Sequence, residues 1–203
     1  METNFNHEQS LALINEMISR ARNNVQKERK HSMIFWGYTV ALIALSNFAL
    51  IHLLSNPHSS FLVWLCILPA WVVSYFIDRR IDRTAMVKTH IDKIGDMVWK
   101  GFGIAVLVLV AIVNIMAFKT NDFHSMMLIN PIIMGAMGMC EFASASIYRY
   151  KPWYWVALFF WAGAIVCAFL RVDWQFMVLA ACMILGFVVP GHLLNYQTKK
   201  SHV

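Results

Sequence analysis

Apolar residues of this chain gather in six long blocks separated by short polar turns. A bilayer core about 30 Å thick requires roughly 20 mostly apolar residues in each helix that crosses it. The predicted spans cover residues 33–54, 61–77, 98–118, 126–147, 153–170 and 176–194. The pattern therefore predicts an all-α polytopic membrane protein whose six transmembrane helices form three hairpins.

Composition agrees with this prediction. The chain has 203 residues, of which 59% are hydrophobic and 14% are charged. A soluble domain usually carries about 25% charged residues, so the alternative of a soluble all-α protein is disfavoured. The polar start METNFNHEQS shows no basic segment followed by an apolar one, so we expect the first span to act as an uncleaved anchor.

Basic residues predict the orientation. Fourteen of the 17 Lys and Arg residues lie in segments that six spans would place on one side. These residues are Arg20, Arg22, Lys27, Arg29, Lys30, Arg79, Arg80, Arg83, Lys88, Lys93, Arg149, Lys151, Lys199 and Lys200. The opposite loops hold only Lys119 and Arg171, and Lys100 begins the third span. Cytoplasmic loops carry such an excess, so we expect both termini in the cytoplasm. The net charge of +6 then requires no nucleic acid.

Residues 1–32 are predicted to form a separate cytoplasmic amphipathic helix. Its apolar residues recur at spacings of three and four, a pattern typical of helix pairing. This candidate oligomerisation stripe contains Leu11, Ile14, Ile18, Ala21 and Val25. Self-association or binding of a cytoplasmic protein is one interpretation. Docking on the chain's own cytoplasmic loop and adsorption to membrane lipids are the others.

The rest of the chain divides into two predicted parts. Residues 33–194 are expected to form the six-helix bundle, with a cytoplasmic helical hairpin extension at 78–97. Residues 195–203 are expected to form a basic cytoplasmic tail. Three prolines interrupt predicted spans: Pro69 the second, Pro131 the fourth and Pro190 the sixth. Broken helices can line a site, although a proline near a helix end usually only kinks it.

Glu141 is the one ionisable residue deep within a predicted span. It lies in the stretch MGAMGMCEFASAS, whose small residues would let another helix approach closely. We therefore expect Glu141 to face the bundle interior, where Lys100 is the nearest candidate partner. Asn114 and Asn130 complete the candidate intramembrane polar site. Such a carboxylate could carry protons or bind a cation or substrate, or it could fix helix packing.

Other chemistry is weakly indicated. None of the four cysteines forms a CxxC pair, and we expect buried free thiols. The methionines around Cys140 could suit Cu(I), but they share no single helix face, so no metal or other cofactor is predicted. Motifs of hydrolases, metalloproteases and nucleotide-binding enzymes are absent from the sequence.

The stretches LALINEMISRARNNVQ and FWGYTVALIALSNFAL resemble a set of small bacterial multispan membrane proteins with no assigned activity. The resemblance covers mainly residues 11–50. It implies a bacterial inner-membrane protein with a short cytoplasmic helix, and it implies no catalytic residues.

Three functions remain open from the sequence. The first is a non-enzymatic membrane interaction protein, such as an oligomeric scaffold, sensor or regulator. The second is a transporter or channel for a small solute or ion that uses Glu141. The third is a membrane enzyme that acts on lipid, because the absence of a motif is weak evidence.

Overall fold

The computed structural model describes residues 31–82, 90–121 and 123–200, and this part of the chain contains helices and no strand. In chain order the elements are the His31–Leu53 helix, the 3₁₀ helix η1 (Pro57–Cys66), α2 (Ile67–Asp82), α3 (His90–Thr120), the 3₁₀ helix η2 (Phe123–Leu128), α4 (Ile129–Tyr148), α5 (Pro152–Ala168), α6 (Val172–Met183), the π-helical turn η3 (Ile184–Val188) and α7 (Val189–Lys200). The prediction of an all-helical chain is confirmed for these residues.

Two predicted parts of the chain lie outside the described residues. The stripe of Leu11, Ile14, Ile18, Ala21 and Val25 is one of them, and it stays a prediction. The other is residues 83–89 of the predicted extension at 78–97. Helix α2 ends at Asp82 and helix α3 begins at His90, so the described parts of that extension are helical.

Five stretches of helix are long and apolar enough to cross a membrane. They are His31–Leu53, Ser59–Arg80, Lys93–Thr120, His124–Tyr148 and Val172–Leu194. The remaining apolar helix, α5, has 17 residues and is about 26 Å long at 1.5 Å per residue. The fifth predicted span is therefore present as an apolar helix, but its 17 residues are fewer than the roughly 20 expected of a transmembrane helix.

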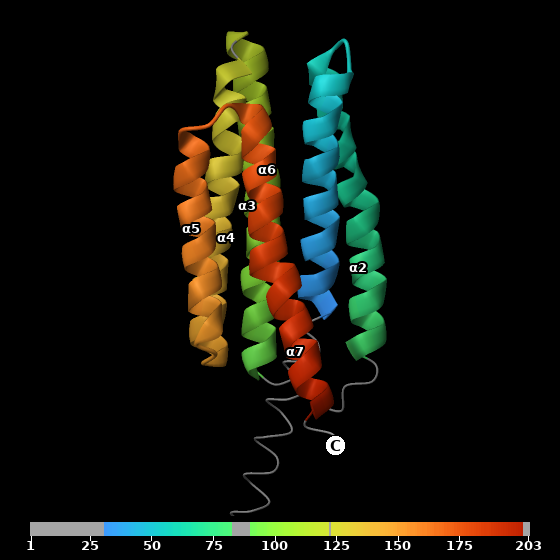
Figure 1. Ribbon diagram of the computed structural model, residues 1–203, viewed down its shortest axis with the longest axis vertical. Helices are drawn as coiled ribbons and strands as arrows, with labels where there is room; N and C mark the ends of the chain where they lie inside the picture. The colour runs from blue at the N-terminus through green and yellow to red at the C-terminus, as the bar shows by residue number, and fades with distance from the viewer. Residues whose placement is uncertain (1–30, 83–89, 122, 201–203) are drawn as a thin grey trace, which may run out of the picture.

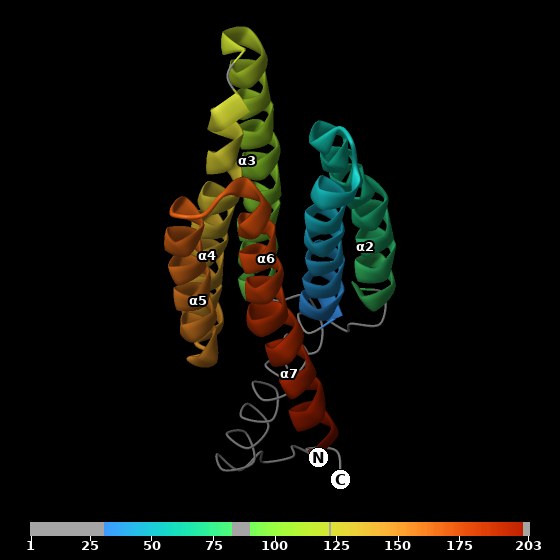
Figure 2. The same ribbon diagram turned by 45° about the horizontal axis from the view of Figure 1, so that its top comes forward.

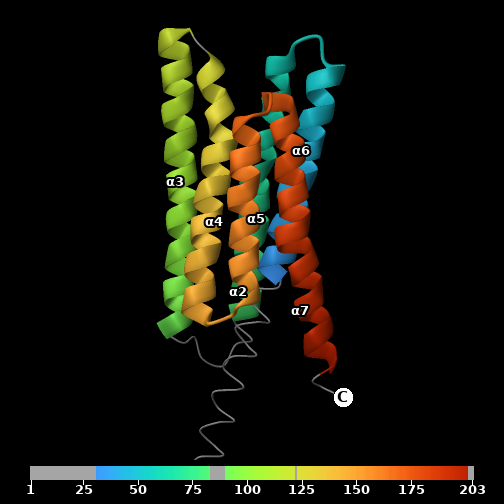
Figure 3. The same ribbon diagram turned by 60° about the vertical axis from the view of Figure 1, so that its left-hand side comes forward.

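The helices run roughly along the long axis of the molecule (Figure 1). Three connections lie at one end, which we call the upper end: from the His31–Leu53 helix to η1, from α3 to η2, and from α5 to α6. In all three views the α5–α6 connection lies lower than the other two (Figures 1, 2 and 3). A low turn at the upper end is thus flanked by two taller pairs of helices.

The opposite end collects basic side chains, and we call it the basic end. Helix α2 finishes there with Arg79 and Arg80. Lys93 lies near the start of α3, and Arg149 and Lys151 lie in the α4–α5 connection at the same end (Figure 1). The uneven distribution of Lys and Arg along the chain therefore becomes an excess of basic residues at one end of the folded bundle.

The His31–Leu53 helix packs antiparallel to the last helical segments along its whole length. Near the basic end Gly37 lies against Val188, and a Cβ atom at Gly37 would come within 2.8 Å of the Val188 side chain. Near the upper end the rings of Phe48 and Trp174 are 5.6 Å apart. On its other side this helix contacts α2, because Trp36 Nε1 donates a hydrogen bond to Ser74 Oγ at 3.2 Å.

The π-helical turn η3 precedes Pro190, which has no N–H and whose ring clashes with the carbonyl of the preceding turn of an α-helix. The turn widens instead, and Val189 N–H donates to the carbonyl oxygen of Ile184. The ring of Phe187 in this turn contacts Trp99 of α3 at 6.0 Å and Phe160 of α5 at 5.5 Å. The widened turn therefore joins segments that are distant in sequence.

Pro69 and Pro131 do not break their helices. Each lies in the first turn of an α-helix that directly follows a 3₁₀ segment, α2 after η1 and α4 after η2. The first backbone N–H groups of a helix lack intrahelical partners, so a proline costs little there. The expected interruptions are therefore changes of helix type within two continuous helical stretches, Ser59–Arg80 and His124–Tyr148.

The four cysteines are free, but they are not all buried. Cys167 and Cys182 are buried, Cys140 is half-buried and Cys66 is exposed. The expectation of four buried thiols is thus wrong for Cys66. Burial was expected because Cys66 lies within an apolar block, but position in such a block does not determine whether a side chain faces the other helices or the outside of the bundle.

Replacement of Gly37 by alanine tests the contact between the His31–Leu53 helix and η3. The new Cβ would lie 3.0 Å from Phe187 Cβ and 3.2 Å from the backbone nitrogen of Val188. Because backbone cannot move aside cheaply, we expect a loss of about 1–3 kcal/mol, measured as a lower Tm in detergent. Gly103→Ala is the control, since its Cβ would meet nothing within 4 Å and helix propensity should raise stability by roughly 0.5–1 kcal/mol. Equal Tm values for Gly37→Ala and the wild type would contradict this packing.

Candidate functional site

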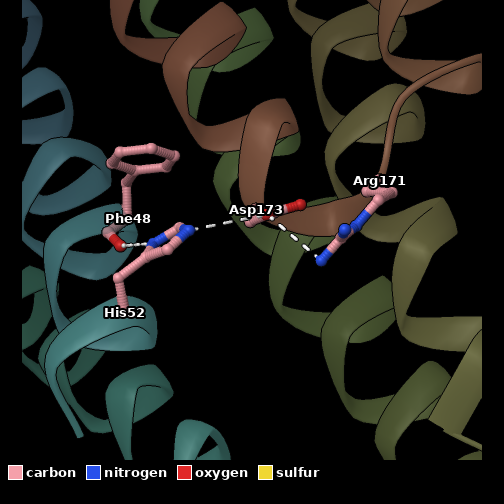
Figure 4. Close-up of polar contacts among 4 residues, drawn as sticks. All are labelled: Phe48, His52, Arg171 and Asp173. Carbon is pink, nitrogen blue, oxygen red and sulfur yellow. Dashed lines mark hydrogen bonds and ion pairs between the residues drawn. The ribbon is translucent and has the colours of Figure 1, made fainter.

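A buried carboxylate at the upper end is flanked by two side chains that can carry positive charge (Figure 4). Asp173 Oδ2 lies 3.8 Å from His52 Nε2 and 3.5 Å from an Nη atom of Arg171. The Asp173 side chain is 7% exposed, whereas those of His52 and Arg171 are 52% and 83% exposed. We call these three residues the Asp173 cluster.

The start of helix α6 positions Asp173. The residue lies in the first turn of α6, where the helix dipole favours a negative charge. Arg171 immediately precedes the helix with an extended backbone. Among the described residues Asp173 Oδ1 has no hydrogen-bond partner, so the carboxylate depends on its charged neighbours for stabilisation.

His52 is oriented by its own helix. Its Nδ1 lies 2.9 Å from the backbone carbonyl oxygen of Phe48. A carbonyl can only accept a hydrogen bond, so Nδ1 carries a proton and donates it. In the neutral imidazole Nε2 would then be an acceptor that faces the acceptor oxygen of Asp173. The contact becomes attractive when Nε2 is also protonated and the ring is positively charged.

Glu141 lies at a different level of the bundle. The side chain is 0% exposed, as its small neighbours led us to expect. Gly138, one turn earlier, lies against Trp161 and the backbone of Ala157 on α5. Ser144, one turn later, is also fully buried. Close packing of α4 on α5 thus surrounds Glu141 in the lower half of the bundle.

Contacts of α4 with α5 and with α3 give the position of Glu141 along the long axis of the bundle. The ring of Phe142 meets that of Tyr154 of α5 edge to face, with ring centroids 5.1 Å apart. On the other side Gly95 of α3 lies directly against the hydroxyl of Tyr148. Glu141 lies seven residues before Tyr148, and Phe102 lies seven residues after Gly95. Because α3 and α4 are antiparallel, Glu141 is level with Phe102, which is partly buried against the core.

Lys100 lies near that level but on another face of α3. Its side chain is exposed, whereas Trp99 and Phe102 pack against the core. Consecutive residues of a helix point about 100° apart, so the face that carries Trp99 and Phe102 turns Lys100 outward. The ion pair between Lys100 and Glu141 stays a prediction, and this geometry offers it no support.

The two asparagines lie nearer the upper end. Asn114 is half-buried, and its Nδ2 donates to the carbonyl oxygen of Val110 at 2.7 Å within α3. Asn130 is 5% exposed near the start of α4. It precedes Glu141 by eleven residues, which is about 16 Å along a helix. The candidate polar residues therefore lie at two levels and do not form one site.

Metal binding finds no support in the described residues. In this part of the chain no group of three or more His, Cys, Asp and Glu side chains could hold a metal ion. Of the methionines considered for Cu(I), Met134 and Met137 are buried whereas Met139 is 67% exposed. These side chains diverge, as expected for methionine used in packing.

Sequence reasoning missed the Asp173 cluster. His52 and Asp173 are far apart in the chain and share no spacing motif, so only the tertiary packing of the first helix on α6 brings them together. One local signal was present: in RVDW an acidic residue directly follows a polar turn, and the first turn of a helix favours such a negative charge.

Comparison of the chain with protein-family models, with curated proteins and with solved structures finds no match. The resemblance of residues 11–50 to small bacterial membrane proteins therefore remains an expectation.

Proposed function

We propose that the protein is a non-enzymatic integral membrane protein that acts through association with other proteins, as an oligomeric scaffold, sensor or regulator. The observation that carries the proposal is the exposure of two spans. In the most apolar windows of Ser59–Arg80 and Lys93–Thr120 only 11% of the residues are buried. Lipid can cover such faces, and so can further transmembrane helices, including those of a second copy.

Helix α3 has features that suit association in a bilayer. A Cβ atom added at Gly101 would meet nothing within 4 Å. Small residues at helix surfaces permit close approach of another transmembrane helix, and here the space beside Gly101 is open. Ile104 and Val108, which lie on the same face and are 64% and 52% exposed, would border that contact.

The proposed topology has six spans with both termini in the cytoplasm of a bacterial cell, and the protein lies in the inner membrane. The location of Arg79, Arg80, Lys93, Arg149 and Lys151 at one end of the bundle supports it. Single cysteines at Asn121 and Arg171, in a cysteine-free background, would be labelled from outside the cell. Labelling from the cytoplasm alone would reverse the orientation.

Oligomeric state tests the proposed function. We expect the purified protein to be a homo-oligomer in mild detergent, measured by light scattering coupled to size exclusion. Leu11→Gln, Ile14→Gln and Ile18→Gln together, or Gly101→Leu alone, should each lower the oligomer fraction severalfold by removing an apolar stripe or close approach.

Controls separate assembly from folding. Ser10→Gln, Asn15→Gln and Ser19→Gln together change polar positions beside the stripe and should leave the oligomer unchanged. Gly103→Ala should do so as well. A wild-type protein that is monomeric throughout, and that captures no partner by cross-linking in its native membrane, would contradict the proposal.

A transporter or channel is the second candidate, and the complete burial of Glu141 favours it. Intramembrane carboxylates commonly mark proton or ion pathways. In proteoliposomes that contain a pH-sensitive dye, Glu141→Gln should then reduce proton flux at least tenfold while Tm stays near the wild-type value. Ser144→Ala is the control at the neighbouring buried position. Wild-type flux equal to that of empty liposomes would exclude this function.

A further inference from the structure

Helix α3 carries an exposed lysine at the edge of its apolar stretch. Lys100 is exposed, whereas its neighbours Trp99 and Phe102 pack against the core. The 18 residues from Gly101 to Phe118 include no charged residue, and they extend about 27 Å at 1.5 Å per residue. The hydrocarbon core of a bilayer is about 30 Å thick. In the proposed topology Lys100 therefore lies where the hydrocarbon core meets the headgroups, on the side of the basic end.

The face that carries Lys100 changes from basic to apolar along the helix. Residues seven apart lie on the same face after about two turns, so Lys93, which is also exposed, precedes Lys100 on that face. Met97 lies between them and is 68% exposed. In the other direction the face continues with Ile104 and Leu107, 64% and 62% exposed. This order of charged and apolar groups matches that of a phospholipid, in which the phosphate is followed by acyl chains.

The direction of α3 turns the Lys100 side chain toward the headgroups. In an α-helix each Cα–Cβ bond tilts toward the N-terminus, and α3 begins with His90 at the basic end. The stem of Lys100 can therefore lie along the helix surface while its ammonium group reaches the polar region. That group donates up to three hydrogen bonds and accepts none, which suits the oxygens of a phosphate.

The charges nearby favour a lipid with a net negative charge. Asp96 is an exposed carboxylate four residues before Lys100, near enough to compete for its ammonium group. Lys93 lies three residues before Asp96, so the two lysines outnumber this carboxylate on the described part of that face. The other Lys and Arg residues of the basic end add positive charge at the same level of the bundle, and basic residues beside a membrane attract anionic lipids.

From these features we infer that an anionic phospholipid, such as phosphatidylglycerol, binds along α3 with its phosphate at Lys100 and an acyl chain over Ile104 and Leu107. The inference rests on the proposed insertion of α3 in a bilayer, but it does not require self-association. Gly101, where we propose close approach of another helix, points about 100° away from Lys100. A lipid and a second copy can therefore occupy adjacent faces of α3.

Native mass spectrometry of the full-length protein in mild detergent tests the inference. The protein is mixed with equal amounts of phosphatidylglycerol and phosphatidylethanolamine, which carry the same acyl chains and differ in mass. We expect the wild type to retain phosphatidylglycerol preferentially. Lys100→Gln should lower the retained fraction about fivefold, the effect expected of one basic side chain near anionic lipids. Lys100→Arg keeps the charge and should retain the lipid.

Lys119→Gln is the matched control, because it removes one exposed lysine from the opposite end of the same helix and should leave retention unchanged. Equal retention of the two lipids by the wild type would overturn the inference. So would a loss in Lys100→Gln that Lys100→Arg or Lys119→Gln reproduces in full.

A second copy is the competing occupant of this face. A lower oligomer fraction in Lys100→Gln, with lipid retention unchanged, would overturn the inference and assign the face to self-association. Lipid adducts and oligomers are resolved by mass in the same measurement. A wild type that is monomeric but retains phosphatidylglycerol would therefore count against the proposed function and would support the lipid site.

Discussion

The contact of η3 with three neighbouring segments holds this bundle together. Pro190 cannot continue the α-helical hydrogen bonding, and the widened turn before it presents Phe187 to Trp99 and Phe160. The same turn brings Val188 against Gly37. Helices α3 and α5 and the His31–Leu53 helix are thereby all in contact with one turn of the last helical segment.

The architecture could be predicted from the sequence to the extent that it depends on block length and polarity. Five stretches that the hydrophobic pattern marks are helices long enough to span a membrane, because apolar blocks and polar turns are local features. The shortness of α5 was also predictable, because the apolar block at 153–170 is one of the shortest and the helix has 17 residues. Its exact end was not, since the carbonyls of Cys167 and Leu170 accept hydrogen bonds from Gln175. The π turn depends in the same way on tertiary packing as well as on Pro190.

The candidate site residues also differ in whether local sequence or tertiary packing determines their positions. Glu141 was recognisable because an ionisable residue within an apolar run is conspicuous, and its burial follows from the small residues of its own helix. Lys100 was chosen by depth alone, and depth does not determine the face on which a residue lies. His52 and Asp173 meet only through the antiparallel packing of two distant helices, for which no local pattern exists.

The low α5–α6 turn has a consequence for the surrounding bilayer. A helix of 17 residues is a few ångströms shorter than a hydrocarbon core about 30 Å thick. In the proposed six-span arrangement the lipid beside α5 must therefore become thinner, or polar groups of the turn must extend toward the headgroups. Arg171, with its long and 83% exposed side chain, is suited to reach upward in this way. Such hydrophobic mismatch costs fractions of a kcal/mol per ångström, so the proposed arrangement favours a bilayer that is locally thinner beside α5 than beside the longer helices.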